Sequence, residues 1–300
     1  MTIVVAGHDM TPDGCHGIFF AGDSGISDGD KLLVAGFKKV FRYPIVVKRP
    51  LIVGSQFRGY AGVAFEGACA IAFAGSTLVA QQFMNSIGNH LSSLYATHEG
   101  NSYCLAMPCE GGRLLNARPG YYQYEDEMFD GYFVTERQLI NGEFIAGVVQ
   151  HALEEVFKYA TQYAGMQDLF RRQRAEFILA MRCYRTSSYR LFKFEILESD
   201  DGNPIVQTRE ILRGMLAVIG MENEFGSDVQ QAYNKAIDSG VLPGSAVAEI
   251  LAEKVQDKNN LGIFKVCGPC ILSVYDGVEL TAVKRIRLQI PDAAKGRPAR

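Results

Sequence analysis

The sequence contains no long hydrophobic run and no long run of charges of one sign. No apolar stretch reaches the roughly 18 residues that a membrane-spanning helix needs, and the first residues lack the basic start and long apolar stretch of a signal peptide. The formal net charge is −3, without the basic clusters that bind nucleic acid or acidic membrane surfaces. We therefore expect a cytoplasmic protein whose partners include neither nucleic acid nor a membrane.

Cysteine and histidine are few and irregularly placed. Seven cysteines are an odd number, unlike the even frameworks of small secreted proteins, so most are expected to be reduced and buried. The five histidines include no pair at helical or alternating spacing. The glycines between residues 54 and 67 lack the spacing of a phosphate-binding loop. The sequence therefore predicts neither a metal site nor a cofactor.

One cysteine pair, Cys267 and Cys270, has the Cys-Gly-Pro-Cys pattern of a thioredoxin active site. A redox motif needs its first cysteine at a helix N-terminus, where the helix dipole lowers the thiol pKa. Residues 271–275 are instead predicted to form a strand, which favours a turn over redox chemistry. Zinc is disfavoured as well, because no second ligand pair has suitable spacing.

What the sequence does contain is a regular succession of strands and helices. Apolar residues spaced three or four apart predict helices near residues 76–94, 145–160, 229–237 and 247–255, with Ser76 as the first N-cap. Apolar runs predict strands at 3–6, 17–21, 31–35, 38–47, 68–74, 176–183, 189–197, 205–209, 215–219, 270–275 and 279–287. Pro44 is expected to break, and Pro50 to end, the strand-forming stretch around residues 38–47. This order predicts an α/β (α+β) fold with two mainly antiparallel sheets between helix layers.

The second residue is a potential nucleophile. Thr2 carries a hydroxyl, and removal of Met1 would add a free amine that can act as the base for that hydroxyl. Many proteins begin with Met-Thr, so the position alone proves little. Asp23 and Lys39 follow, however, and a buried lysine held by an aspartate would place a positive charge beside the hydroxyl oxygen.

Four short motifs give the chain a resemblance to a known family. Thr-Ile-Val at 2–4, Phe-Ala-Gly-Asp at 20–23, Gly-Phe-Lys-Lys-Val at 36–40 and Ala-Phe-Ala-Gly-Ser at 72–76 resemble successive signatures of proteasome β subunits and the bacterial HslV peptidase. Their order and the spacing from aspartate to lysine match. Those proteins are self-activating N-terminal-nucleophile (Ntn) hydrolases. The resemblance implies a four-layer αββα sandwich and a threonine-type peptidase or amidohydrolase.

The resemblance also implies roles for individual residues. Thr2 would attack the peptide carbonyl, and Asp23 and Lys39 would tune its reactivity. Ala74 and Gly75 would bind substrate backbone, with an amide that stabilises the oxyanion.

Further substrate contacts follow from the same resemblance. Ser27 matches a hydroxylic position that pairs with substrate backbone, and Ser227 is the candidate for a serine that contacts the nucleophile's amine. An apolar pocket for the residue before the cleaved bond would be lined by Ile26, Phe37, Phe41 and Phe73. The alternative is that these four are ordinary core residues.

The resemblance extends to domain organisation. We expect one domain over residues 1–290, with insertions at about 47–70 and 98–143 and a flexible tail at 291–300. The expected partners are a peptide or protein substrate, further copies of the chain in a homo-oligomeric ring or double ring, and an ATP-dependent unfoldase.

Two alternatives remain open at this point. Phe264 and Cys267 stand where the family has an aspartate and a serine, which favours a non-catalytic relative that assembles or binds a partner without hydrolysis. The second alternative is an Ntn-type transpeptidase or ligase, which would transfer the acyl group to another amine instead of to water.

Overall fold

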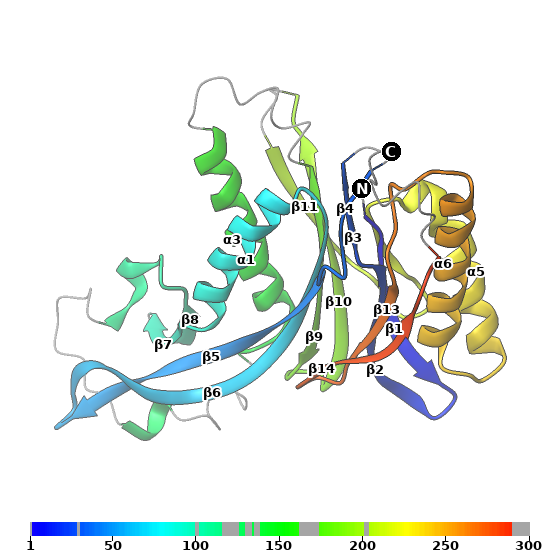
Figure 1. The fold of residues 1–300 in the computed structure, drawn as a ribbon. Helices are drawn as coiled ribbons and strands as arrows, with labels where there is room; N and C mark the ends of the chain where they lie inside the picture. The colour runs from blue at the N-terminus through cyan, green and yellow to red at the C-terminus, as the bar shows by residue number, and fades with distance from the viewer. Residues whose placement is uncertain are drawn as a thin grey trace.

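The computed structural model describes residues 2–28, 31–99, 102–115, 126–129, 134, 139–161, 174–200 and 204–289 (Figure 1). These residues form two large sheets, a two-stranded ribbon and four α-helices. The prediction of a mixed α/β fold is confirmed. The predicted tail at 291–300 and much of the predicted insertion at 98–143 lie outside the described residues.

The first sheet has five strands and is antiparallel throughout. Its strands, in spatial order, are β12 (Ala217–Ile219), β1 (Val4–Thr11), β2 (Gly14–Asp23), β13 (Cys270–Tyr275) and β14 (Leu280–Ile286). Chain segments from both ends of the sequence therefore meet at β2.

The second sheet has seven strands, of which only the pair β5 and β7 is parallel. In spatial order they are β11 (Pro204–Glu210), β10 (Ser188–Glu198), β9 (Ala175–Cys183), β6 (Gln56–Gly75), β5 (Val40–Val53), β7 (Leu94–Glu99) and β8 (Ser102–Ala106). The two-stranded ribbon consists of β3 (Gly25–Asp28) and β4 (Lys31–Ala35).

The four helices are α1 (Thr77–Leu91), α3 (Gly142–Thr161), α5 (Glu222–Asp238) and α6 (Pro243–Asn260). Short 3₁₀ turns lie at η1 (Gly111–Arg113) and η3 (Asp126–Phe129). The Ser76 side chain accepts a hydrogen bond from the Val79 amide, which confirms Ser76 as the N-cap of α1. Pro243 begins α6 in the first turn, where its missing N–H has no partner to lose. None of the described helices is long and apolar enough to cross a membrane.

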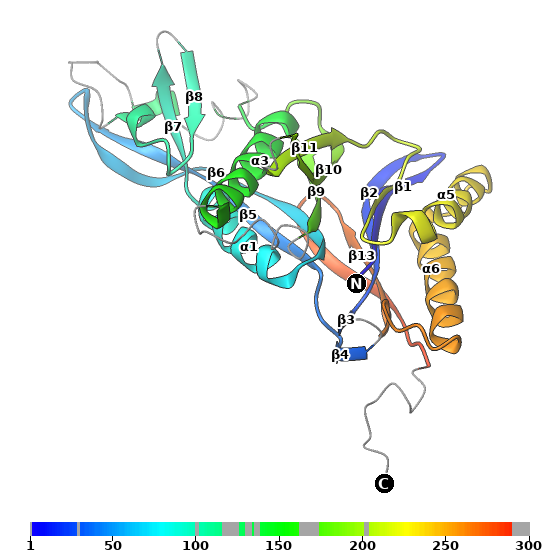
Figure 2. The same cartoon turned by 90° about the horizontal axis from the view of Figure 1, so that it is seen from above.

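Three clusters of buried apolar side chains set the order of these elements in space. In one cluster Phe83 of α1 packs on Phe177 of β9, between the seven-stranded sheet and the pair α1 and α3. In another, Phe19 of β2 packs on Tyr233 of α5, between the five-stranded sheet and the pair α5 and α6. The third fills the space between the sheets with small and branched residues such as Ala72. Figures 1 and 2 show the same arrangement, with one helix pair on the outer side of each sheet.

The long hairpin of β5 and β6 contradicts the expected strand break at Pro44 and the expected strand end at Pro50. β5 runs through both prolines, and Pro44 pairs with Ala68 of β6. On its other side β5 pairs with β7 only at Val47 and Lys48, so Pro44 lies at a strand edge, where no ladder hydrogen bond is lost. The predicted insertion at 47–70 is the outer part of this hairpin.

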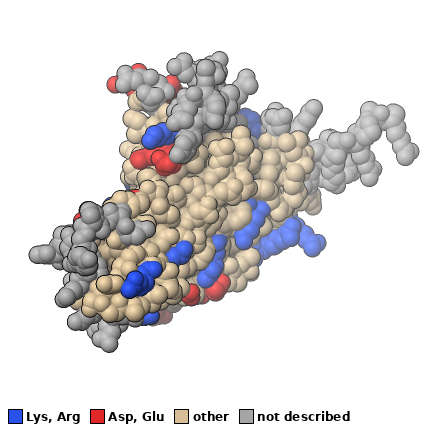
Figure 3. All heavy atoms as spheres, turned by 90° about the vertical axis from the view of Figure 1, so that its left-hand side faces the viewer, with Lys and Arg blue, Asp and Glu red and all other residues tan. Residues whose placement is uncertain are grey.

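The outer part of the hairpin extends beyond α1 and α3, away from the five-stranded sheet (Figure 2). Leu51, Val53 and Val63 are exposed there. The face on this side of the molecule is mostly uncharged, with Lys and Arg side chains in a row along it (Figure 3). The hairpin therefore presents apolar side chains that this single chain does not cover.

Candidate functional site

Thr2, Asp23 and Lys39 meet where the two sheets face each other. Antiparallel pairing of β1 with β2 sets Val4 opposite Gly22, which brings Thr2 beside Asp23 at the end of β2. Lys39 directly precedes β5 of the other sheet, and its carbonyl accepts a hydrogen bond from the Phe73 amide of β6. The three residues lie at or just before the ends of different strands, and all three are almost fully buried.

The Thr2 hydroxyl lies between a cation and an anion. Lys39 Nζ donates a hydrogen bond to Thr2 Oγ1, and Thr2 Oγ1 donates to Asp23 Oδ1 at 3.2 Å. Lys39 Nζ also forms an ion pair with Asp23 Oδ1 at 2.7 Å. The hydroxyl is therefore oriented by both charged groups.

The Asp23 carboxylate accepts five hydrogen bonds. Oδ1 accepts from Thr2, from Lys39 and from the Ile3 amide at 2.9 Å. Oδ2 accepts from the Gly25 amide at 3.2 Å and from the Cys267 amide at 3.4 Å. A buried carboxylate needs such partners, because an unpaired charge in the interior is strongly unfavourable.

Burial lowers the pKa of Lys39 below its ordinary value of 10.5, and the charge and hydrogen bond of Asp23 offset only part of this effect. A lysine with a lowered pKa loses its proton more readily and can serve as a base. Burial and the nearby Asp23 charge raise the pKa of the Cys267 thiol to about 11, so this thiol stays neutral at pH 7. Lys39 is thus the group beside Thr2 that is suited to accept a proton.

A glycine turn holds the Thr2 main chain. Gly220 follows β12 with a left-handed φ of +94°, and a Cβ at this position would overlap the Thr2 carbonyl oxygen. The same added Cβ would lie 3.3 Å from the Cβ of Ala74. The end of β6 with Ala74 therefore lies next to Thr2, across the Gly220 turn.

The predicted substrate-binding residues have different surroundings. Ala74 is buried and Gly75 is exposed, with a φ of +101° that only glycine adopts easily. Ser27 lies in β3, and its hydroxyl donates to the Lys265 carbonyl at 2.8 Å. The Ser27 side chain thus holds the segment before β13.

Three of the four residues predicted for an apolar pocket gather around one ring. Phe73 is buried, Phe37 meets it edge-on at 6.2 Å between ring centroids, and Phe41 stacks on it at 6.4 Å. Ile26 lies on the ribbon strand β3 and is half-buried. A cavity of about 310 Å³ is lined by Phe37 together with Asp23 and Lys39. Phe37 is therefore the predicted pocket residue that borders open space beside the site.

Ser227 is not part of this group. The α5 helix begins at Glu222, five residues earlier than a turn containing Ser227 would require. Ser227 consequently lies within the helix, with its side chain exposed. The turn that does approach Thr2 is formed by Gly220.

The structure adds charged groups that the sequence did not single out. Glu176 of β9 accepts a hydrogen bond from the Gly220 amide at 2.6 Å, and burial raises its pKa. Lys193 of β10 is fully buried and pairs with Glu222 at 2.6 Å and Glu195 at 2.9 Å. Burial would lower the pKa of Lys193, but these hydrogen bonds raise it. In the sequence these two groups are marked only by being charged residues within largely apolar strands, Glu176 in β9 and Lys193 in β10.

The Cys267–Cys270 pair has the strand context that the sequence predicted. Cys270 begins β13, opposite Asp23 of β2, and both thiols are free and buried. Burial raises the pKa of the Cys270 thiol to about 12. Redox motifs depend on a lowered thiol pKa, so these surroundings are the reverse of theirs.

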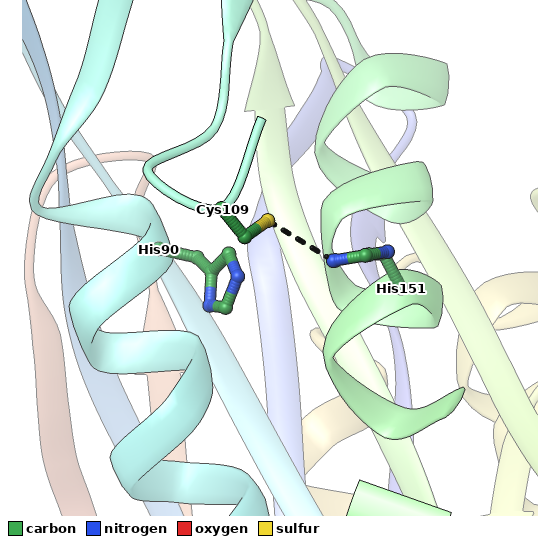
Figure 4. Close-up of side chains that lie close together, drawn as sticks. All are labelled: His90, Cys109 and His151. Carbon is green, nitrogen blue, oxygen red and sulfur yellow. Dashed lines mark hydrogen bonds between the residues drawn. The ribbon is translucent and has the colours of Figure 1, made fainter. Parts of the chain in front are cut away.

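A second group of side chains joins two histidines that the sequence places far apart, at neither helical nor alternating spacing. His90 of α1 and His151 of α3 lie with their ring centroids 5.6 Å apart. Cys109, after β8, lies against His151 (Figure 4). Packing of α1 on α3 brings together residues that no local spacing connects, and these three donors could hold a metal ion.

Comparison with known proteins finds similar solved structures. No protein-family model and no curated protein matches the sequence. The structure is similar to an Anbu (Gly-1) mutant from Hyphomicrobium sp. strain MC1, with 17% identity and a TM-score of 0.51 over 98% of this chain and 90% of that one. It is also similar to Anbu (ancestral beta-subunit) from Yersinia bercovieri, with 14% identity and a TM-score of 0.50 over 95% and 87%. At these identities the likeness shows the fold.

This likeness corrects the family inferred from the sequence. The motifs around Thr2, Asp23 and Lys39 predict a proteasome β subunit or HslV, whereas the similar structures are Anbu proteins, one of them described as an ancestral beta-subunit. Short motifs describe only the strands around a site. The similarity to the Anbu structures instead covers nearly the whole chain.

The contact between Gly220 and Thr2 can be tested by Gly220→Ala, which combines left-handed strain with overlap on the Thr2 carbonyl. We expect it to lower the free energy of unfolding by about 2–4 kcal/mol in urea denaturation. Gly214→Ala is the matched control, because Gly214 has a φ of +90° and no atom within 4 Å of an added Cβ. It is expected to lose only the strain, about 1–2 kcal/mol. Equal losses in the two variants would show that the Thr2 contact is unimportant.

Proposed function

We propose that this chain is an Ntn-type amide hydrolase with the Anbu-like fold, in which Thr2 is the nucleophile once Met1 has been removed. The observation that carries the proposal is the Thr2 hydroxyl held between Lys39 Nζ and Asp23 Oδ1 in a buried site. Such a hydrolase has the four-layer αββα arrangement. Two apolar clusters lie between a sheet and its helix pair, and the third lies between the two sheets, which supports that arrangement.

In the acylation step, neutral Lys39 accepts the proton of the Thr2 hydroxyl, and Oγ1 attacks the carbonyl carbon of an amide. The carbonyl π electrons move to oxygen, and a tetrahedral oxyanion forms. Its collapse breaks the C–N bond, the lysine returns the proton to the leaving amine, and an ester remains on Thr2. Water then hydrolyses the ester, with the same lysine taking and returning a proton. The free Thr2 amine is a second candidate for the base.

The substrate backbone would lie along the end of β6. Gly75 is exposed, follows buried Ala74 and lies near Thr2 across the Gly220 turn, so its amide is our candidate for the oxyanion donor. The neighbouring cavity, bordered by Phe37, suits an apolar side chain. A peptide or protein substrate with an apolar residue before the cleaved bond fits these surroundings.

A non-catalytic scaffold is the second candidate function. It is favoured by the exposed position of Ser227 within α5 and by a neutral Cys267 thiol in place of a polar group beside Asp23. The two functions differ in whether Thr2 reacts. Labelling with an epoxyketone or boronate directed at threonine decides between them.

A ring or double ring of identical chains would enclose the site, and an ATP-dependent unfoldase would then deliver protein substrates to it. The exposed Leu51, Val53 and Val63 of the projecting hairpin support contact with a second copy.

We expect closed rings in negative-stain images of the purified chain. The variant Leu51→Glu with Val53→Glu is expected to reduce the fraction of assembled particles at least about tenfold, since two buried charges oppose the contact. Monomers alone in the unmodified protein would contradict the ring.

The nucleophile is tested by Thr2→Ala, which removes the attacking hydroxyl. We expect it to abolish probe labelling and to lower the hydrolysis of fluorogenic peptide amides at least about 10³-fold. Thr2→Ser, which keeps a hydroxyl, is expected to retain measurable activity, and Thr11→Ala at the far end of β1 serves as the control. Intact-protein mass spectrometry must show loss of Met1. Retained Met1, or labelling of the Thr2→Ala protein, would contradict the proposal.

The pH dependence of kcat/KM tests Lys39 as the base. A protonated lysine cannot accept the hydroxyl proton, so we expect the rate to rise with pH through the lowered pKa of Lys39. Asp23→Asn removes the negative charge that raises this pKa, so the rising limb is expected to move to lower pH even though kcat falls. Asp228→Asn on the outer helix α5 is the control. A limb that stays in place or moves to higher pH in Asp23→Asn would exclude this role.

A further inference from the structure

A cluster of three side chains lies on the outer side of the seven-stranded sheet and belongs to none of the chemistry at Thr2. His90 comes from the last turn of α1, His151 from the middle of α3, and Cys109 from the segment between β8 and η1 (Figure 4). The packing of α1 against α3 presents both imidazoles to the same space, and the Cys109 segment closes over it.

The donor atoms are close enough to share one ion. Cys109 Sγ and His151 Nε2 are 3.2 Å apart, and one donor atom of each of the three residues lies within 4.8 Å of the other two. In a tetrahedral zinc site with bonds of about 2.0–2.3 Å, the nitrogen and sulfur donors lie about 3.3–3.6 Å apart. Small rotations of the side chains are therefore enough to reach that geometry.

The two ring nitrogens of His90 have different surroundings. Nδ1–H donates to the Ser86 carbonyl at 2.8 Å, so in the neutral ring the lone pair lies on Nε2. Within the described part of the chain this Nε2 is buried and has no hydrogen-bond partner. A histidine ligand commonly has its second nitrogen fixed by a carbonyl in this way. A buried lone pair without a partner is the feature that a bound cation would explain.

We propose that His90, Cys109 and His151 bind a zinc ion, with a fourth position open to water. Two imidazoles and a thiolate are the donors that zinc prefers, whereas magnesium and calcium prefer oxygen ligands. A simple cysteine–histidine pair for nucleophilic catalysis would account for Cys109 and His151 but not for the unpartnered Nε2 of His90.

Cys109 is exposed, so zinc can reach the site from solvent. The ion would tie the Cys109 segment to both α1 and α3. We expect it to stabilise this side of the molecule, independently of any reaction at Thr2.

The test uses the full-length chain, stripped of metal with EDTA and kept reduced with a phosphine. Isothermal titration with zinc chloride measures stoichiometry and affinity, and cobalt substitution reports a thiolate ligand through its charge-transfer band. Cys109→Ser and His151→Gln remove ligands. Cys104→Ser and His98→Gln, which change the same residue types on the adjacent strands β8 and β7, are the matched controls.

We expect one zinc ion per chain in the unmodified protein and in both controls, and affinity at least about tenfold weaker in each ligand variant. The cobalt charge-transfer band is expected to disappear in Cys109→Ser, and zinc is expected to raise the Tm of the unmodified protein but not of that variant. Because Cys109 is exposed, Cys109→Ser is expected to fold normally. Absence of stoichiometric zinc binding, or equal affinity in the ligand variants and the controls, would overturn the site.

Discussion

The buried carboxylate of Asp23 is the group on which the structure around Thr2 depends. It accepts hydrogen bonds from the Thr2 hydroxyl, the Lys39 ammonium and three main-chain amides. These donors come from both sheets and from both ends of the sequence. Because an unpaired charge in the interior is so unfavourable, the carboxylate requires all of these segments to keep their positions. The hydroxyl of Thr2 is consequently held in one orientation before any substrate binds.

Close approach of main chains makes this arrangement possible. A Cβ on Gly25 would lie 2.6 Å from the Cys267 sulfur, and one on Gly220 would overlap the Thr2 carbonyl. Glycine at these positions lets the ribbon strand and the segment before β13 approach the carboxylate of Asp23, and lets the turn after β12 approach Thr2. The same burial that this convergence produces lowers the pKa of Lys39. Packing and reactivity therefore have one common cause at this site.

Much of the fold follows from local pattern, because apolar periodicity and capping act over a few residues. The four helices lie where that periodicity places them, and α1 begins after Ser76. Ser227 lies within α5 and not in the turn before it, because the helix begins at Glu222 with an exposed first turn that the apolar pattern does not reveal. Pro44 does not break its strand because it lies at an edge, where β5 has no paired strand on one side. The sequence does not show which strands neighbour β5. The relation to Anbu structures likewise emerged only from similarity over nearly the whole chain.

The sequence by itself determined the grouping of Thr2, Asp23 and Lys39. Each lies near the start or end of a strand. Pairing of β1 with β2 brings Thr2 beside Asp23, and the facing sheet adds Lys39, which precedes β5. Only the tertiary structure decided that His90, Cys109 and His151 form one cluster. Cys109 and His151 are 42 residues apart in the chain; Cys109 lies between β8 and η1, and His151 lies in α3. Their meeting depends on how two helices pack through side chains, and local sequence pattern does not encode that packing.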